Sequence, residues 1–370
     1  MRTVDIDFAN RRQLARLITQ VENDPEAAAA IVRAVWPRTG QARRIGITGP
    51  PGSGKSTVVD QIIERARAEG ARVAVIAVDP SSPFSGGAIL GDRVRMLRHS
   101  GDADVFIRSM AARSAVGGLA AATRDAAHLL DAFEFDVILL ETVGVGQSEL
   151  DVMRAADTVV VITVPGLGDS IQMLKAGVLE IADLLVVNKA DRPGADETAM
   201  HLREMLRMAP PSPGAVGAVG AVSPASAVAR STSQDVERAP VSAVEWSTSQ
   251  DVERAPASAV AGGHLSQAWN VAWEIPVLKT VATDGTGIDA LWQTIRRHRE
   301  FLRESGQLGA RRRQRVEREV LEKVEQALAA HLRSRLAGQP GLGEILARAR
   351  AGDLDPHSAA RAILDHLLKG

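Results

Sequence analysis

A glycine-rich stretch, GPPGSGKST at residues 49–57, has the residue types that bind a chain of phosphates. It matches the pattern G-x-x-x-x-G-K-[ST], follows an apolar run of strand length and leads into a helical segment. Glycines let backbone N–H groups wrap phosphate oxygens, and the helix that follows adds the positive end of its dipole. We expect Lys55 to reach the β- and γ-phosphates and the Ser56 hydroxyl to bind Mg²⁺. The expected phosphate-binding residues are Gly49, Pro50, Pro51, Gly52, Ser53, Gly54, Lys55, Ser56 and Thr57.

Acidic residues near predicted strand ends are candidates for holding the metal. Glu141 follows an apolar strand in LLETVGVGQSE, Asp79 ends the run ARVAVIAVD, and Asp92 lies further along the chain. Hard oxygen ligands suit Mg²⁺, which few protein carboxylates and several waters usually hold. Asp79 and Asp92 could instead cap a helix or pair with Arg93 or Arg95, and Glu141 could be a plain acid at a strand end. We interpret Glu141 as the carboxylate that holds the water shell of the metal.

A second polar motif, NKAD at residues 188–191, also follows an apolar strand. An aspartate there can accept two hydrogen bonds from the N1–H and N2–H₂ edge of guanine, a donor pair that adenine lacks. We expect Asp191 to recognise the base, Asn188 to hold the loop and the stem of Lys189 to lie on the base. The alternative is an ordinary polar loop after a strand. A further base-contacting loop, acting through its backbone, is expected at Val281, Ala282 and Thr283.

Strand-like segments that could position these motifs recur along the chain. Seven runs are nearly continuous Val, Ile and Leu, as expected for strands covered on both faces. Helical or loop segments separate the runs, and this alternation predicts an α/β fold with a doubly wound, mostly parallel sheet. The runs are RRIGITG, ARVAVIAVD, ADVFIRS, FDVILLE, TVVVITV, LLVVNK and PVLKTVA.

The sequence predicts three parts in the order of the chain. Residues 1–40 are an N-terminal helical segment, with helical spacing over 11–35; residues 41–300 are the nucleotide-binding domain. Within that domain, about 210–265 is rich in Ala, Gly, Pro, Ser and Val and contains STSQDVERAP twice. Two copies are too few for a solenoid, so we expect a disordered insertion, with a functional tether as the alternative.

Residues 301–370 form a predicted C-terminal helical arm. Helical patterns cover 288–305, 311–336 and 355–370, and the middle one has an apolar stripe that must be buried on the sheet or on a second copy. We interpret RRRQR at 311–315 as a solvated face rather than a nucleic-acid patch, because acids follow it. The stripe consists of Val316, Val320, Leu321, Val324, Leu328 and Leu332.

Composition narrows the class of protein. A formal net charge of -1 and a pI near 6.7 argue against a nucleic-acid-binding protein. The chain has no cysteine, which excludes disulfides, thiolate metal sites and cysteine nucleophiles. Its apolar runs are too short to span a membrane, and MRTVDIDFANRRQLARL is not typical of a signal peptide. We expect a cytoplasmic protein that binds neither membrane nor nucleic acid.

Together these motifs resemble the MeaB/ArgK group of P-loop GTPases in the SIMIBI class, the counterparts of the human methylmalonic aciduria type A protein. The resemblance rests on GPPGSGKST, VDPSSPFSGGAILGDRVRM, RSMAARSAVGGLA, ETVGVGQSE and VPGLGDSIQMLKAGVLEIADLLVVNKAD. It implies a homodimeric GTPase that uses GTP, GDP and Mg²⁺ to gate cofactor delivery to an adenosylcobalamin-dependent acyl-CoA mutase and to protect it. The cobalamin adenosyltransferase is a further possible partner. The alternatives are an ATP-using kinase of the arginine-transport type and a nickel-delivery GTPase, the latter disfavoured by the missing cysteines.

The resemblance also assigns roles beyond the first two motifs. It places Asp79, Asp92 and Glu141 around the metal, and it matches residues 165–177 to a third switch loop. Within that loop, Lys175 corresponds to a lysine that approaches the nucleotide when the partner is bound.

The stretch after Glu141 bears on the rate of hydrolysis. The Gly144 N–H is expected to meet the γ-phosphate, but Val145 cannot orient a water, so intrinsic hydrolysis should be slow. Lys175 is then the candidate for the charge that stabilises the transition state. The expected catalytic residues are Lys55, Glu141 and Lys175.

Overall fold

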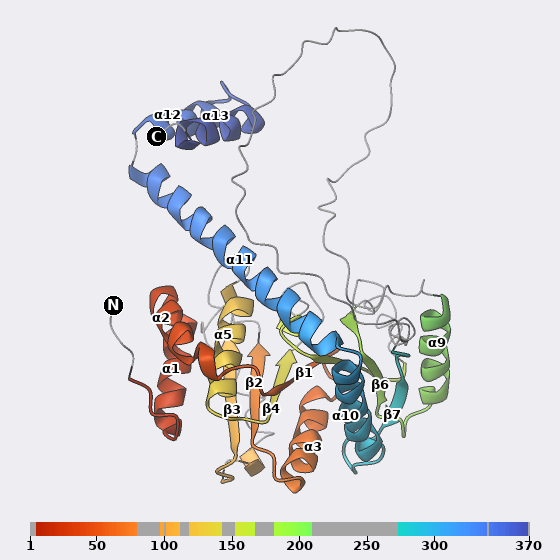
Figure 1. Cartoon of the computed structure of the whole chain (residues 1–370). Coiled ribbons are helices and arrows are strands. Elements are labelled where there is room, and N and C mark those ends of the chain that lie inside the picture. The colour runs from red at the N-terminus through yellow and green to blue at the C-terminus, as the bar shows by residue number, and fades with distance from the viewer. Residues whose placement is uncertain are drawn as a thin grey trace, which may run out of the picture.

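Seven parallel strands form one sheet in the order β3-β2-β4-β1-β5-β6-β7. The computed structural model describes residues 5–79, 97–99, 101–111, 118–142, 152–166, 181–208, 273–338 and 340–368. Each predicted apolar run overlaps one strand, so the expected doubly wound α/β sheet is confirmed (Figure 1). The strands are β1 Arg43–Thr48, β2 Val73–Asp79, β3 Val105–Ala111, β4 Val137–Thr142, β5 Thr158–Thr163, β6 Leu184–Asn188 and β7 Val277–Thr280.

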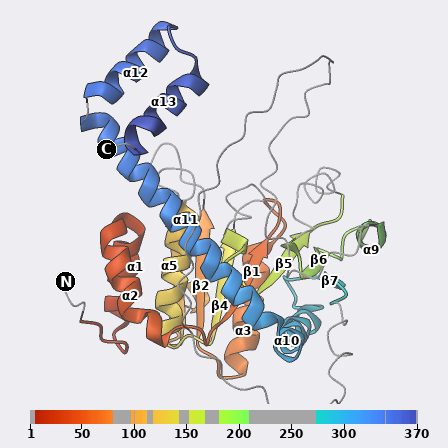
Figure 2. The ribbon, with the colours of Figure 1, turned by 45° about the horizontal axis from the view of Figure 1, so that its top comes forward.

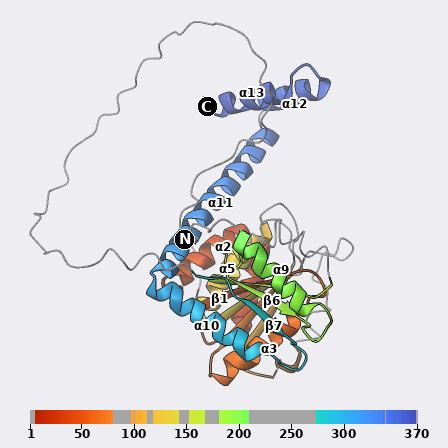
Figure 3. The same cartoon turned by 90° about the vertical axis from the view of Figure 1, so that its right-hand side faces the viewer.

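Helices cover both faces of the sheet, and each face has its own apolar core. One core joins the sheet to α1, α2, α5 and α9, and the other joins it to α3 and α10. Figure 3 shows these layers from the side of β7. The helices are α1 Arg11–Asn23, α2 Pro25–Val35, η1 Trp36–Arg38, α3 Lys55–Ala68, η2 Leu97–His99, α5 Gly118–Ala132, α9 Ala195–Met208, α10 Ile288–Glu304, α11 Gln307–Gly338, α12 Pro340–Ala351 and α13 Pro356–Leu368.

The N-terminal helical segment is two helices rather than one continuous pattern over 11–35. Asp24 ends α1 and caps α2, because its side chain accepts hydrogen bonds from the backbone of Glu26 and Ala27 at 2.9 and 3.0 Å. Pro25 occupies the first position of α2, where the missing N–H costs nothing. Leu14 of α1 is fully buried in the core that also contains α5. The chain therefore turns between the helices without losing contact with the sheet layer.

The C-terminal arm leaves the sheet on α11 and ends in the pair α12 and α13 (Figure 1, Figure 2). The expected helices correspond to α10, α11 and α13, but α12 was not predicted. Its sequence begins PGLG, and Gly341 and Gly343 both lower helix propensity. Burial of Leu342 and Ile363 between the paired helices offsets that weakness.

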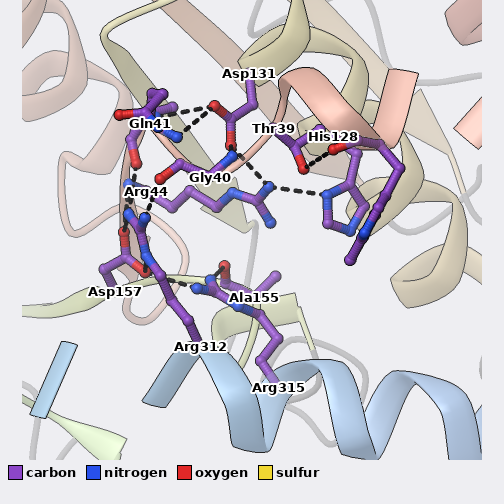
Figure 4. Close-up of polar contacts among 12 residues, drawn as sticks. Thr39, Gly40, Gln41, Arg44, His128, Asp131, Ala155, Asp157, Arg312 and Arg315 are labelled. Carbon is purple, nitrogen blue, oxygen red and sulfur yellow. Dashed lines mark hydrogen bonds and ion pairs between the residues drawn. The ribbon is translucent and has the colours of Figure 1, made fainter. Parts of the chain in front are cut away.

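The RRRQR stretch docks on the sheet domain, so the prediction of a solvated face is wrong. Arg312 and Arg315 both donate to the buried carboxylate of Asp157, with contacts of 2.9 and 2.7 Å. Arg311 donates to Asp183 at 2.9 Å. Figure 4 shows Arg312 and Arg315 extending from α11 toward Asp157. Burial alone raises the pKa of Asp157, but Arg315 and Arg312 outweigh it and hold that pKa at about 2.

Further along α11, charged pairs continue the contact with α5. Glu319 lies 3.2 Å from Nε2 of His128, and Lys323 lies 3.2 Å from Asp125. Glu322 pairs with Arg124. We call this row of contacts, from Arg311 to Lys323 on α11, the charged seam. The helix therefore turns its polar face toward the protein.

The apolar stripe of α11 points away from the sheet. Five of its six members are between 36% and 63% exposed and Leu332 is half-buried, so the sheet domain does not bury the stripe. An exposed stripe of this kind on one helix is typical of a surface that contacts another protein. The exposed members are Val316, Val320, Leu321, Val324 and Leu328.

Across the described ranges, no helix is both long enough and apolar enough to cross a membrane. The expected insertion at about 210–265 falls outside these ranges. The three-part division at 40 and 300 stays a prediction.

Candidate functional site

The GPPGSGKST loop connects β1 to α3 at the carboxyl edge of the sheet. Gly49 and Gly54 have φ angles of 150° and 90°, which side chains rarely tolerate. A Cβ at Gly49 would lie 2.0 Å from the carbonyl oxygen of Ile162, and one at Gly54 would lie 2.3 Å from Nδ2 of Asn188. The two glycines are therefore required for backbone conformation and for space.

Lys55 begins α3 and its ammonium group stays inside the loop. Its Nζ donates to the carbonyl oxygens of Gly49 and Pro50, both at 3.0 Å, and the residue is 6% exposed. Gly54, the residue that caps α3, has no side chain to bond the first N–H groups of the helix. A buried cation beside a helix N-terminus and a glycine turn is a suitable environment for phosphate oxygens.

Ser56 and Glu141 come together directly behind the loop. The Ser56 hydroxyl donates to Oε1 of Glu141 at 2.7 Å, and both residues are buried. Glu141 lies on the interior strand β4, paired with Ile47 of β1 and Ala77 of β2. The register therefore brings the main chain of Asp79, two residues beyond Ala77, to the same edge of the sheet.

The donor atoms of this pair suit Mg²⁺. A hydroxyl and a carboxylate oxygen in contact are the hard ligands that this ion prefers, and few protein groups are needed because waters complete its shell. Two of the four expected metal residues, Ser56 and Glu141, are thus brought together. The Asp79 side chain and all of Asp92 lie outside the described residues, so their roles stay predictions.

Asn188 connects three parts of the site. Its Nδ2 donates to the Ser53 carbonyl of the phosphate-binding loop at 2.8 Å. Its Oδ1 accepts from the Thr280 hydroxyl at 3.1 Å and from the Ala282 N–H at 3.2 Å. At 2% exposed, Asn188 is a buried junction between this loop, the end of β6 and the loop after β7.

The rest of the NKAD motif curves over the edge of the sheet. Lys189 adopts a left-handed φ of 56°, and its Nζ donates to the Gly52 carbonyl at 2.7 Å. Asp191 follows in the same turn and is exposed to solvent. The Ala282 N–H already donates to Asn188, whereas Val281 is partly exposed and Thr283 is exposed. Strain at a non-glycine residue next to a binding loop is typical of a functional site.

Two positioning residues were not predicted from the sequence. Thr280, the last residue of β7, bonds Asn188, and only the pairing of these two residues across β6 and β7 could have indicated it. Asp60, one turn after Ser56 on α3, accepts from Arg98 at 2.6 Å and contacts His99 at 2.8 Å. Asp60 thereby fixes η2 to the helix that begins at the phosphate-binding loop.

Gly144 and Lys175 lie outside the described residues, so the structure does not place them.

A family model described as "Methylmalonyl Co-A mutase-associated GTPase MeaB" matches residues 14–337 of this chain. The chain belongs to the MeaB family. This is a family of P-loop GTPases, and the chain carries the P-loop sequence pattern at residues 49–57.

Curated relatives agree with the MeaB assignment. A putative GTPase of Pyrococcus abyssi is 45% identical over 98% of this chain and 94% of its own. The mitochondrial methylmalonic aciduria type A homolog of Mus musculus is 43% identical over 40% of this chain and 36% of its own. A crystal structure titled LAO/AO transport system kinase has a TM-score of 0.58 and 22% identity, covering 97% of this chain and 99% of that one. The last comparison shows that the MeaB chain shares that fold.

Proposed function

We propose that this protein binds GTP and hydrolyses it to GDP in an Mg²⁺-dependent reaction. The observation that carries the proposal is the Ser56–Glu141 contact of 2.7 Å directly behind a glycine loop that holds a buried lysine. When bound, Mg²⁺ neutralises charge on the β- and γ-phosphate oxygens. Ser56 and Glu141 would hold and orient the ion, with Asp79 and Asp92 as further expected ligands.

The other contacts to the nucleotide come from side chains and backbone groups of this chain. Lys55 supplies a fixed positive charge to the phosphates, and the N–H groups at the start of α3 supply hydrogen bonds. Asn188 keeps the phosphate loop and the base loops in one arrangement, which positions Asp191 to accept from the guanine edge. We therefore expect a guanine nucleotide to bind more tightly than an adenine nucleotide.

Hydrolysis by the isolated protein is expected to be slow. In the sequence, Val145 occupies the position of a water-orienting glutamine and cannot orient a water, and we expect Gly144 to contribute only its backbone N–H to the γ-phosphate. Lys175 is the residue that we assign to transition-state stabilisation, because a lysine brought to the nucleotide would supply the positive charge that an arginine finger supplies in related reactions. The reaction therefore depends on a partner that brings Lys175 to the nucleotide.

We assign the partner to the adenosylcobalamin-dependent acyl-CoA mutases, of the methylmalonyl-CoA mutase type. The family description names that mutase, and the mouse relative is named for methylmalonic aciduria. In this proposal, GTP binding and hydrolysis gate cofactor delivery and protect or reactivate the mutase in the cytoplasm. The cobalamin adenosyltransferase is a second candidate partner.

A homodimer is the proposed working form. The exposed apolar stripe of α11 would be buried by contact with the same stripe of a second copy of the chain. Leu321→Glu and Leu328→Glu, at two of the exposed positions, should convert a dimer into a monomer in sedimentation measurements. A wild-type protein that sediments as a monomer at micromolar concentration would contradict this assignment.

The decisive experiment measures GTP turnover with and without an adenosylcobalamin-dependent methylmalonyl-CoA mutase. We expect the mutase to stimulate turnover, and Lys175→Ala to lose the stimulated rate while keeping the basal rate. Lys279→Ala is the matched control, because that lysine is half-exposed and pairs with Asp196. Equal loss of both rates in Lys175→Ala would refute the role of Lys175, and no effect of the mutase on rate or complex formation would refute the partner.

Nucleotide choice tests the first part of the proposal separately. GTP should bind more tightly than ATP, and Asp191→Ala should remove that preference. Tighter binding of ATP, unchanged in Asp191→Ala, would favour a kinase or ATPase instead.

A further inference from the structure

The loop after β7, residues 281–287, is a closed turn, and we call it the β7 loop. The Val281 N–H donates to the Thr286 carbonyl at 2.9 Å, and the Gly285 N–H donates to the Val281 carbonyl at 3.1 Å. The Thr286 N–H also donates to Oδ1 of Asp284 at 2.8 Å. Because these bonds join the two ends of the loop, a contact at one end also places the other end, where the expected base-contacting residues lie.

The two ends of the β7 loop are supported by different parts of the protein. At the first end, the Ala282 N–H donates to Oδ1 of Asn188 at 3.2 Å. At the second end, two side chains of α3 lie against Gly285: a Cβ at this position would be 3.2 Å from Nη2 of Arg65 and 3.5 Å from Oε1 of Gln61. Gly285 also has a φ of 84°, which side chains rarely tolerate. The chain therefore passes close to Arg65 only because glycine occupies this position.

Arg65 is fixed in place by partners on both sides of this contact. Its Nη1 donates to Oε1 of Gln61 at 2.7 Å, one turn earlier on α3, and its Nε donates to Oδ1 of Asp289 at 2.9 Å. Asp289 lies in the first turn of α10, which directly follows the β7 loop. The Arg65 side chain is only 24% exposed. Arg65 thus joins α3 to the end of the β7 loop and to the helix that leaves it.

The same helix α3 begins at the phosphate-binding loop. Lys55 and Ser56 are its first residues, and Arg65 follows Ser56 by nine residues, or roughly 14 Å along the helix axis. One rigid element therefore contacts both the loop that is expected to bind the phosphates and the loop that is expected to contact the base. A ligand that must reach both loops binds more tightly when their separation is already fixed, because less conformational entropy is lost on binding.

A second link between α3 and α10 lies outside this arrangement. Glu69, one turn after Arg65, accepts from Nε1 of Trp292 at 2.9 Å and from Nη1 of Arg296 at 2.7 Å. The two helices lie beside each other on one face of the sheet (Figure 3). The Arg296–Glu69 pair joins the same helices as the Arg65–Asp289 pair, and its residues lie further from the β7 loop along both helices. Arg296 therefore separates the packing of α3 on α10 from the placement of the β7 loop.

We infer that Arg65 is a positioning residue for base recognition, which holds the β7 loop at a fixed distance from the phosphate-binding loop. Arg65 does not touch the nucleotide; it acts through Gly285 and Asp289 on the loop that does. The inference rests on the proposed function, because it concerns the base of the bound guanine nucleotide. It adds a second support for the β7 loop to the one that Asn188 provides.

The first test compares a nucleotide with a ligand that has no base. Calorimetry in the presence of Mg²⁺ measures the binding of GDP and of inorganic pyrophosphate, which needs only the loop at 49–57. Arg65→Gln should lower GDP affinity about fivefold, the upper range for an ion pair of this exposure, and leave pyrophosphate affinity unchanged. Arg296→Gln is the matched control and should change neither. Arg65→Lys should recover only part of the GDP affinity, because an ammonium group lacks the fork that holds Gln61 and Asp289 together.

Steady-state GTP turnover provides the second measurement. Arg65→Gln should raise KM about fivefold and leave kcat unchanged, whereas Arg296→Gln should leave both unchanged. Equal losses of GDP and pyrophosphate affinity, equal losses of GDP affinity in Arg65→Gln and Arg296→Gln, or a fall in kcat at constant KM would overturn the inference. So would wild-type affinity for GDP in Arg65→Gln, which would leave the proposed function intact. A wild type that does not bind GDP would overturn the proposed function and the inference together.

Discussion

Removing the side chain of Asn188 should disconnect the phosphate-binding loop from the rest of the site. Asn188→Ala eliminates one hydrogen bond to the Ser53 carbonyl and two from Thr280 and Ala282. The residue is 2% exposed, so water cannot easily replace the lost contacts. At about 1 kcal/mol for each hydrogen bond, the free energy of unfolding should fall by roughly 3 kcal/mol.

The same change should weaken nucleotide binding. The Ser53 carbonyl is part of the loop that wraps the phosphates, and without Asn188 this loop must be ordered when the ligand binds. If about half of the lost energy reappears as that ordering cost, GDP affinity falls roughly tenfold.

Urea unfolding and calorimetric titration with GDP measure the two effects on the same preparations. Thr280→Val removes a single hydrogen bond to Asn188 and should cost about 1 kcal/mol, and the double variant should cost less than the sum of the two. Asn23→Ala, which removes an exposed contact to the Thr19 carbonyl, is the control and should stay within about 0.5 kcal/mol of wild type. Additive losses, or Asn188→Ala with unfolding energy and GDP affinity near those of wild type, would refute the reasoning.

Three further predictions concern the loop, the metal and the arm. Gly54→Ala should lower GDP affinity more than tenfold, because the new Cβ would lie 2.3 Å from Nδ2 of Asn188. Gly70→Ala is the control: Gly70 also has a positive φ, of 81°, but a Cβ there meets open space, so this variant should only lose about 1 kcal/mol of stability. Ser56→Ala should abolish the Mg²⁺ dependence of GDP affinity; an unchanged Mg²⁺ titration would exclude Ser56 as a ligand. The pKa of Asp157 is held at about 2 in the folded protein, below its unfolded value of 3.8, so its stabilisation of about 2 kcal/mol is complete only above about pH 5 and is lost progressively as the pH falls toward 2. Urea midpoints between pH 2 and 5 should therefore change less in Asp157→Asn than in the wild type, and equal slopes would contradict this.

Sequence patterns predicted the strands and the glycine-rich loop, because each of these features depends on only a few residues that are adjacent in the chain. Nearly continuous Val, Ile and Leu runs leave little alternative to buried strands. In GPPGSGKST, the conformation that phosphate binding needs depends on glycines within the loop itself, so Gly49 and Gly54 were placed without knowledge of the fold. Ser56 and Glu141 were matched because parallel strands bring their carboxyl ends to one edge.

Contacts between residues that are far apart in the sequence were not predicted. Thr280 and Asn188 are 92 positions apart, and their bond depends on which strands are neighbours. Arg315 and Asp157 are 158 apart, so the charge pattern of α11 showed a polar face but not that it is the docked one. Helical propensity likewise underestimated α12, where tertiary burial of Leu342 outweighs two glycines.

The charged seam restricts α11 to a single register. Contacts between apolar side chains tolerate a shift along a helix, because one methyl group replaces another. A shift of α11 by one turn, about 5.4 Å, reverses the signs that meet in the seam. In one direction Glu319 takes the place of Arg315 and meets Asp157; in the other it takes the place of Lys323 and meets Asp125.

Repulsion between like charges opposes both shifts, so translation of α11 along its axis by one turn is energetically unfavourable. A register set by charge also fixes the distance from the phosphate-binding loop to α12 and α13 to within one helical turn. The charged pairs thus fix the position of α11 along its own axis. Conformational coupling between the nucleotide site and the end of the arm therefore requires rotation or release of α11 rather than its translation.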